Sequence, residues 1–201
     1  NHSPVQRKRF CMKLIRHIIG ILFSPRQTWQ TIAAEQTDAR GLYTGYIMPV
    51  ALIPVCASLV GTVLAARASG QTAPASWLSI GIGTVVGYGL LLSIIGALAC
   101  LANKLSPRFG GLSDPSKALQ LAAYSATAGM VGSVFSVFPD LIIAGMLALL
   151  YSFYLMFLGA PAMLKTPQEK AFSFAFMMLI CSLPIGAVFA GIFSLAFSLF
   201  R

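Results

Sequence analysis

Side chains that could perform acid–base or metal chemistry are few in this chain of 201 residues. It holds five Asp and Glu, two His and four Cys. Both histidines, His2 and His17, precede the first long apolar segment, and no two cysteines have the CxxC spacing of metal and redox sites. Phosphate-binding loops, zinc-protease motifs and nucleophile elbows are absent from the sequence. We therefore predict that the protein is not an enzyme, with no catalytic residues, no cofactor and no metal site.

Hydroxyl groups are the chemical groups that recur inside the apolar parts of the chain. Tyr124, Ser125, Tyr151 and Tyr154 could line a polar cavity between helices and bind a transported molecule. In membrane proteins such side chains also form hydrogen bonds between helices without any further role. Both interpretations stay open here, and a continuous polar cavity joining these four residues would distinguish them.

The composition indicates what elements must position these groups. Hydrophobic residues make up 57% of the chain and charged residues 9%, against about 25% charged residues in a soluble domain. Five segments of at least 20 residues lack Asp, Glu, Lys and Arg, which is long enough to cross about 30 Å of hydrocarbon as a helix. We predict an all-α membrane protein whose domain 41–201 has five transmembrane helices, at about 43–66, 77–102, 118–138, 141–164 and 171–200.

The amino-terminal region differs from this domain. Residues 1–11 precede Met12 and are interpreted as a non-native or upstream extension. Residues 12–40 form a basic, amphipathic region, in which 13–23 is too short to span and predicts an interfacial helix. Ser24, Pro25 and Gln27 then form a helix-start signature with Ser24 as the N-cap, and Gly41 is expected to end the region. We predict that Arg16, Arg26 and Trp29 contact lipid at the membrane interface.

Small residues recur every four positions on two of the predicted spans. This spacing places them on one helix face and lets a neighbouring helix approach closely. Prolines inside the spans, which remove a backbone donor, predict bends. The packing residues are Ser79, Gly83 and Gly87 on the second span and Ser125, Gly129 and Ser133 on the third, and the prolines are Pro49, Pro54, Pro161 and Pro184.

The formal net charge of +9 has a topological explanation. With five spans, twelve of the fourteen Lys and Arg fall on the side of the amino terminus, and only Arg67 and Arg201 fall on the other. The positive-inside rule then predicts a cytoplasmic amino terminus and an outer carboxyl terminus. We expect no nucleic-acid partner, because a polar surface with interleaved aromatic residues is lacking.

Three stretches together resemble a known family. They are 23–35, with Phe23-Ser24-Pro25 and Trp29; 109–125, with Phe109-Gly110-Gly111 and the string ALQLAAYS; and 149–171, LLYSFYLMFLGAPAMLKTPQEKA. They resemble the bacterial branch of the Yip (Ypt/Rab-interacting-protein) family, over roughly residues 20–200. One departure is Ala128-Gly129, where relatives often have a proline. The resemblance implies a five-helix membrane protein with a cytoplasmic amino terminus, and it carries no catalytic residues to transfer.

The leading hypothesis is a multi-pass protein of the bacterial inner membrane that organises or shapes membrane, or scaffolds partners. Its expected partners are the bilayer, anionic lipids on the cytoplasmic face, and further copies of the chain or other membrane proteins. The alternative is a transporter, channel or lipid-moving protein with a hydroxyl-lined site between kinked helices. An enzyme acting on lipid is a third class, disfavoured because the five acidic residues lie almost wholly in loops.

Overall fold

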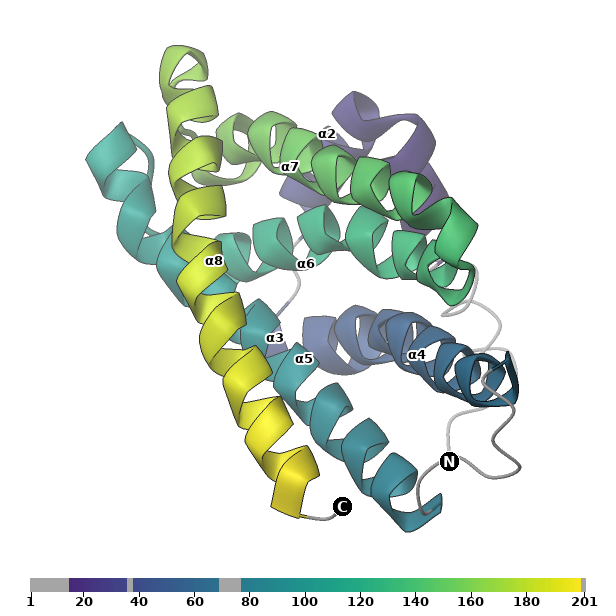
Figure 1. The fold of residues 1–201 in the computed structure, drawn as a ribbon. Coiled ribbons are helices and arrows are strands. Elements are labelled where there is room, and N and C mark those ends of the chain that lie inside the picture. Colours follow the sequence, from purple (N-terminus) through teal and green to yellow (C-terminus); the bar gives the residue numbers. More distant parts are fainter. Residues whose placement is uncertain (1–14, 36–37, 69–76, 200–201) are drawn as a thin grey trace, which may run out of the picture.

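The structure is a computed structural model, and it describes residues 15–35, 38–68 and 77–199. The predicted extension 1–11 lies outside these residues. Every regular element in the described part is a helix (Figure 1). Five helices are long and apolar enough to cross a membrane: Ala39–Ala68, Ile80–Phe109, Pro115–Phe135, Ile142–Leu164 and Gln168–Leu195. This confirms the predicted all-helical class with five candidate spans and a helical amino-terminal region.

The first span begins earlier than its apolar residues indicate. It consists of α3 (Ala39–Leu42), the π-helical η1 (Tyr43–Ile47) and α4 (Met48–Ala68) in direct succession. Asp38 is the N-cap, and its carboxylate accepts a hydrogen bond from the backbone N–H of Gly41 at 3.3 Å. Gly41, expected to end the amino-terminal region, therefore lies inside a helix, because a side-chain cap supports the first turn without apolar residues.

The remaining spans follow the predicted segments closely. The second is α5 (Trp77–Leu105), continued by the 3-10 turn η2 (Ser106–Phe109). The third is α6 (Pro115–Gly132), where the Asp114 carboxylate caps the helix by accepting from the N–H groups of Ser116 and Lys117. The 3-10 turns η3 (Ser133–Val137) and η4 (Pro139–Leu141) make the expected tight hairpin, followed by α7 (Ile142–Leu164) and α8 (Gln168–Leu199).

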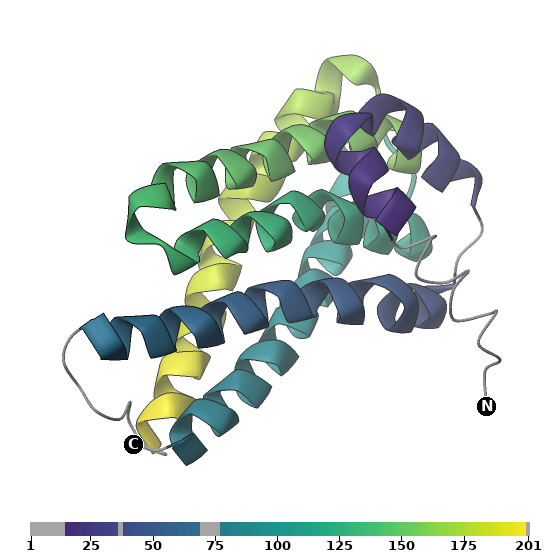
Figure 2. The same cartoon turned by 90° about the vertical axis from the view of Figure 1, so that its right-hand side faces the viewer.

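Helix α6 lies at the centre of the bundle. In its apolar window 67% of the residues are buried, against 6–22% in the other four spans, and in both ribbon views it lies between α7 and the pair α4 and α5 (Figures 1 and 2). It also has the lowest mean hydropathy of the five, 1.2 against 2.0–2.3. A helix carrying Gln120, Ser125 and Thr127 is suited to a protein interior rather than to lipid, because polar groups in lipid lack partners.

Two short helices lie across one end of this bundle, as Figure 2 shows. They are helix 15–23 and α2 (Pro25–Ala34). The predicted helix start is confirmed, because Ser24 is the N-cap of α2 and Pro25 its first residue, although the Ser24 side chain makes no capping hydrogen bond. The backbone instead stays hydrogen-bonded across the junction: the Ser24 N–H donates to the Gly20 carbonyl at 2.8 Å, and the Thr28 N–H donates to the Ser24 carbonyl at 3.1 Å.

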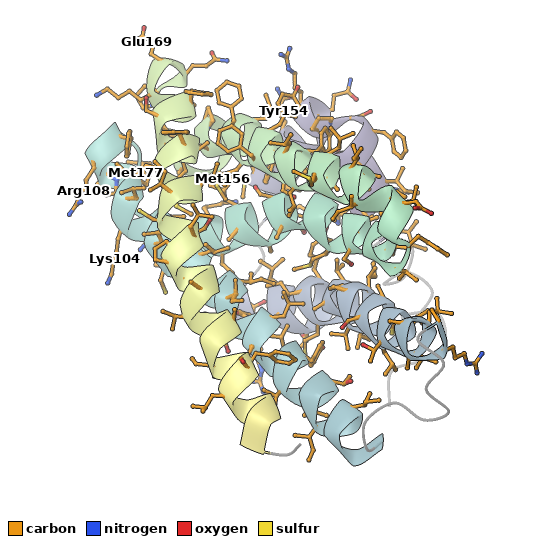
Figure 3. The ribbon with its side chains drawn as sticks, in the orientation of Figure 1. Lys104, Arg108, Tyr154, Met156, Glu169 and Met177 are labelled. Carbon is orange, nitrogen blue, oxygen red and sulfur yellow. The ribbon has the colours of Figure 1, made fainter. Side chains whose placement is uncertain are left out.

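Charged side chains gather at the ends of the spanning helices. Figure 3 shows Lys104 and Arg108 at one end of α5 and Glu169 at the start of α8. The loop after α5 reaches the end of α7, where the Leu112 N–H donates to the Leu164 carbonyl at 2.7 Å. The amino-terminal helices, the α5–α6 loop and the α7–α8 turn therefore share one end of the bundle, and their basic residues lie there together.

Candidate functional site at the amino-terminal end of the bundle

Tyr124 of α6 lies at the centre of an aromatic cluster that joins four parts of the chain. Its ring centroid is 4.3 Å from Tyr46 of η1, 5.7 Å from His17 of helix 15–23 and 6.3 Å from Trp29 of α2. All four side chains are buried. The Tyr46 hydroxyl forms a 2.7 Å hydrogen bond with Oγ1 of Thr127, which bonds in turn to the Ala123 carbonyl. Aromatic packing of this kind stabilises beyond the apolar area it buries.

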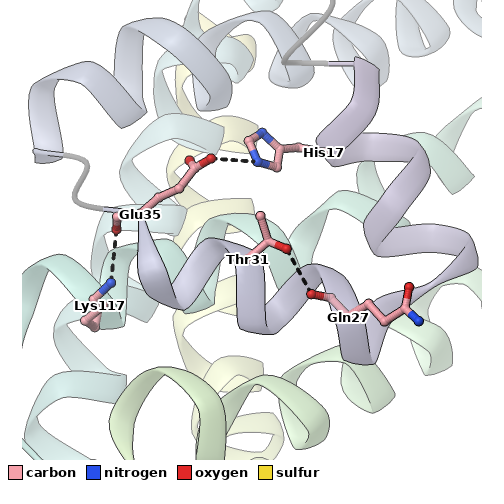
Figure 4. Close-up of polar contacts among 5 residues, drawn as sticks. All are labelled: His17, Gln27, Thr31, Glu35 and Lys117. Atoms are coloured by element: carbon pink, nitrogen blue, oxygen red, sulfur yellow. Dashed lines mark hydrogen bonds and ion pairs between the residues drawn. The ribbon is translucent and has the colours of Figure 1, made fainter.

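Polar contacts hold the ends of both amino-terminal helices. The Lys117 ammonium donates to the carbonyls of Ala33 at 2.7 Å and Glu35 at 3.2 Å, at the end of α2 (Figure 4). The Tyr151 hydroxyl donates to the Leu22 carbonyl at 2.7 Å, at the end of helix 15–23. The last carbonyls of a helix lack intrahelical donors and carry the negative end of its dipole. A cation and a hydroxyl from α6 and α7 therefore satisfy groups that would otherwise face the bundle unpaired.

His17 and Glu35 connect the two short helices directly. His17 Nε2 lies 3.6 Å from a Glu35 carboxylate oxygen, and Figure 4 shows the pair bridging the two helices. On the outer face of α2, Thr31 donates its hydroxyl to the Gln27 carbonyl at 3.1 Å. Together with the Lys117 contact, the pair makes helix 15–23 and α2 one structural unit fixed on α6 and α7.

Trp29 does not offer an exposed side chain to lipid as predicted, because it is buried against the bundle and borders only the cavity between α2 and the end of α7 described below. It is 1% exposed, and its ring lies close to Gly159 of α7, where an added Cβ would come within 2.6 Å of a ring atom. Trp29 and Ile32 do share one face of α2, but that face packs on the bundle rather than on lipid. Arg16 and Arg26 are exposed, and their lipid contact stays a prediction.

The four hydroxyl residues predicted to line a polar cavity do not share one. Tyr124 and Ser125 are buried in the core, Tyr151 is bonded to Leu22, and Tyr154 is 40% exposed on α7 (Figure 3). None of them lines either of the two cavities described below. The prediction is corrected for a geometric reason: the presence of hydroxyls along a helix does not fix its rotation. Tyr124 and Ser125 of α6 face packed neighbours, whereas Tyr154 of α7 is exposed.

The packing face predicted on α6 is present at Gly129. Its N–H donates to Oγ of Ser152 on α7 at 2.8 Å, and an added Cβ would lie 3.2 Å from that oxygen. Gly132, three positions on, is closer still, since its added Cβ would overlap the Ala148 side chain. Ser125 is buried, whereas the Ser133 hydroxyl bonds to the Met130 carbonyl of its own chain segment. The four-residue spacing thus located the face but missed its tightest residue.

The second predicted packing face, on α5, lines a cavity instead. Gly83 and Gly87 face a space of about 600 Å³ between α4, α5 and α8, and the Gly87 Cβ would make only an ordinary 3.4 Å contact with Phe193. The side chain of Ser79 lies outside the described side chains. Gly87 therefore does not make the close helix contact predicted for it, and close packing through Gly83 stays a prediction.

The glycine pair after α5 fixes the α5–α6 loop. Gly110 has a left-handed conformation, with φ of 80°, which residues with a side chain rarely adopt. At Gly111 an added Cβ would overlap Oγ of Ser106 and lie 2.9 Å from the Leu164 carbonyl. The loop can therefore lie directly on the end of α7 only because neither residue carries a side chain.

A second cavity, of about 350 Å³, lies between α2 and the end of α7. It combines a cation and amides with an apolar wall, and Arg26 and Gln30 are four residues apart on one face of α2. Sequence reasoning singled out Arg26 but missed Gln30 and Gln168, because only the packing of α2 on α7 brings them together. The lining residues are Arg26, Trp29, Gln30, Phe157, Leu158, Pro161, Ala162 and Gln168.

No group of three His, Cys, Asp or Glu side chains that could hold a metal ion occurs among residues 15–35, 38–68 and 77–199. The described cysteines, Cys56, Cys100 and Cys181, are free thiols on three different helices.

A bundle of four strongly apolar helices around a less apolar central helix, with two short helices fixed across one end, defines a multispanning membrane protein. The family model of the Yip1 domain matches residues 19–198, and the chain belongs to this family. It is similar to the inner membrane protein YohC of Escherichia coli K12, with 24% identity over 164 residues that cover 79% of this chain and 84% of the relative. YohC of E. coli O6:H1 strain CFT073 matches with the same identity and coverage. No solved structure gives a significant match.

Proposed function

We propose that this protein is a non-enzymatic organiser of the bacterial inner membrane, in which the amino-terminal helices form a platform that contacts anionic lipids and holds partner proteins. The observation that carries the proposal is that the platform is fixed to the bundle and also exposes basic residues. Part of the platform is fixed to α6 and α7 through His17, Trp29 and the Lys117 contact, whereas Arg16 is exposed on helix 15–23 and Arg26 is exposed on α2 beside the cavity at the end of α7. A rigid basic surface beside a bilayer attracts anionic lipid at about 1 kcal/mol per cation.

The orientation belongs to the same proposal. The amino-terminal helices, the α5–α6 loop and the α7–α8 turn lie at one end of the bundle, together with Lys104, Arg108 and Lys117. Arg67 lies in the last turn of α4, at the opposite end of the bundle. This gathering supports a cytoplasmic amino terminus under the positive-inside rule. The location of YohC, an inner membrane protein by name, supports the same membrane for this chain.

The alternative, a transporter, channel or lipid-moving protein, now rests on the cavity between α4, α5 and α8. Its walls are mainly apolar, and the hydroxyls of Thr62 and Thr84 donate to carbonyls of their own helices, at Ser58 and Ile80. A polar substrate would find few free donors there. The cavity favours a hydrocarbon chain over an ion, so a lipid-moving activity is the form of the alternative that deserves testing.

The lipid contact can be tested with purified protein in vesicles that contain spin-labelled phosphatidylglycerol or phosphatidylcholine. We expect the protein to enrich the anionic lipid in its boundary shell, and Arg16→Glu with Arg26→Glu to lower that preference at least about fivefold. Arg40→Glu with Arg108→Glu changes the net charge equally at exposed positions and should retain most of the preference. An equal loss in both double variants would contradict a dedicated platform.

A flux assay distinguishes the transport alternative from the organiser proposal. Sealed liposomes containing the protein are compared with empty ones for movement of monovalent ions, divalent ions and fluorescent lipids. We expect no movement above empty liposomes. Lipid movement that Gly83→Leu abolishes, by filling the cavity between α4, α5 and α8, would replace the organiser proposal with lipid transport.

A further inference from the structure

We infer that the cavity between α2 and the end of α7 binds the headgroup of an anionic glycerophospholipid, with Arg26 as the phosphate ligand. The inference rests on the proposed function, because it assigns a defined site to the lipid contact. A cavity of about 350 Å³ lies within the range of about 300–1,000 Å³ typical of small-ligand sites. The site therefore has room for a headgroup and the adjoining part of a lipid.

The polar side of the cavity suits a phosphate. Arg26 is exposed and makes no ion pair with any described residue, so its guanidinium fork is available to two phosphate oxygens. Gln30 of α2 and Gln168 of α8 add amide groups that can donate to further oxygens. Arg26 also lies in the first turn of α2, where the helix dipole is positive and favours an anion. The charge of Arg26, the amide donors and the helix dipole therefore all favour an anionic ligand.

The charged residues nearest the cavity in the chain are basic in balance. Lys165 in the α7–α8 turn and Lys170 in α8 are exposed, and Glu169, which follows the lining residue Gln168, is the one acidic residue between them. The neighbouring end of α2 carries Arg26 alone, with no acidic residue in its first turn. Charge complementarity therefore favours an anion over a zwitterion at this site.

The apolar side distinguishes a lipid from a free phosphate. Phe157, Leu158, Pro161 and Ala162 form the wall, two to seven residues before α7 ends at Leu164. At 1.5 Å per residue this wall extends from about 3 to about 10 Å along α7 from its end, so the glycerol and first acyl carbons of a lipid whose phosphate is bound at Arg26 would lie against it. Inorganic phosphate or an acidic peptide would leave this surface uncovered.

One unsatisfied polar group lies beside the same cavity. Trp29 lines the cavity, and its Nε1–H has no acceptor among the described residues. Because this nitrogen is buried in the present conformation, it would donate to a phosphate oxygen only after the indole ring turns toward the cavity.

The test uses Trp29 as its own reporter. The chain has two tryptophans, so Trp77→Phe leaves Trp29 alone, and the purified full chain in detergent is titrated with brominated phosphatidylglycerol or brominated phosphatidylcholine. We expect quenching of Trp29 at about fivefold lower concentrations of the anionic lipid. Arg26→Gln should abolish this preference, and Arg40→Gln, an exposed arginine on α3, should retain it.

A second variant tests the apolar wall independently of charge. Ala162→Phe fills the cavity and should raise the concentration of phosphatidylglycerol needed for quenching, with Arg26 intact. Equal quenching by the two lipids, or a preference that survives Arg26→Gln, would overturn the site. Competition by inorganic phosphate at the same concentration as the lipid would show that the pocket takes a free anion and would overturn the lipid assignment.

This experiment and the boundary-lipid experiment fail in different ways. If Arg26→Gln leaves the Trp29 signal unchanged while the Arg16 and Arg26 pair still controls boundary lipid, the platform stands and the pocket is wrong. If the Trp29 signal depends on Arg26 but the boundary shell ignores both arginines, the pocket stands and the organiser proposal is wrong.

Discussion

The two ends of the bundle are built differently. At the amino-terminal end, α8 buries Ala171, Phe174, Ala175 and Met178, all within its first eleven residues. No side chain described in α8 beyond Met178 is buried, and the same holds for α4 beyond Ala57. At the far end α4, α5 and α8 leave an apolar cavity between them, although α6 and α7 still pack closely there at Gly132 and Ala148. For α4 and α8, specific packing is therefore concentrated where the amino-terminal helices lie, and we expect that end to govern stability.

The largest difference between the two ends is expected when one glycine at each end of α7 is substituted. At Gly159 an added Cβ would come within 2.6 Å of Trp29 and Leu121, whereas at Gly145 it would meet nothing within 4 Å. Gly159→Leu should lower the free energy of unfolding by about 3 kcal/mol, because α2 cannot move away without exposing Trp29. Gly145→Leu should change it by less than about 0.5 kcal/mol. Thermal unfolding in detergent measures both, and similar losses would refute the division into two ends.

Lys117 tests the polar attachment of α2. Lys117→Met keeps the length of the side chain but removes the donor to the Ala33 and Glu35 carbonyls. The expected loss is about 2 kcal/mol, the range of a charge-assisted hydrogen bond. Amide hydrogen exchange should speed up in residues 25–35 and stay unchanged in α5. Lys104→Met, at an exposed position, is the matched control, and faster exchange in that variant as well would point to a general charge effect.

Tyrosine hydroxyls give a smaller and graded test. Tyr46→Phe removes the buried 2.7 Å hydrogen bond to Thr127, whose hydroxyl still donates to Ala123, so the expected cost is about 1 kcal/mol. Tyr88→Phe removes an exposed 3.1 Å bond to the Met48 carbonyl and should cost less than about 0.5 kcal/mol. Denaturant or thermal unfolding of the two variants measures both losses of unfolding free energy. Equal losses would mean that burial of the hydrogen bond does not determine its contribution.

The smallest effect is expected at the far cavity, and with the opposite sign. Gly87→Ala adds a methyl group that makes an ordinary 3.4 Å contact with Phe193, and it lowers the entropy of the unfolded chain. We expect a gain of about 0.5 kcal/mol. Gly132→Ala, where the added Cβ would overlap Ala148 on α7, should instead destabilise the protein. A loss at Gly87 comparable to that at Gly132 would show that α5 is tightly packed after all.

The sequence predicted the elements better than the contacts between them. Runs without charge located the five candidate spans, because a charged residue in hydrocarbon is costly and the ends of the helices carry the charges. The first span begins earlier than the apolar pattern predicted, because the Asp38 carboxylate caps an additional helical turn that has few apolar residues. Spacing placed Trp29 and Ile32 on one face of α2 but could not indicate which neighbour that face meets.

The site depended on relations between distant residues. Arg26 was singled out for its charge, but Gln30 and Gln168 join it only because α2 packs on α7, and Gly159 makes that approach possible. The local sequence around Gly159 or Gly145 does not indicate which neighbour, if any, the glycine meets. The predicted polar cavity failed for the same reason: Tyr124 and Tyr154 are both hydroxyl residues on spans, yet one is buried and the other exposed.

The low hydropathy of α6 has a consequence for how the protein is made. Four spans have mean hydropathies of 2.0–2.3, whereas α6 has 1.2. During translocon-mediated insertion, the four apolar helices can each partition into lipid alone, but an isolated α6 would expose Gln120 and Thr127 to hydrocarbon. The short η3–η4 connection links it directly to α7. Biogenesis of the central helix therefore favours entry as a hairpin with its successor, so α6 is the segment whose membrane insertion depends most on the chain that follows it.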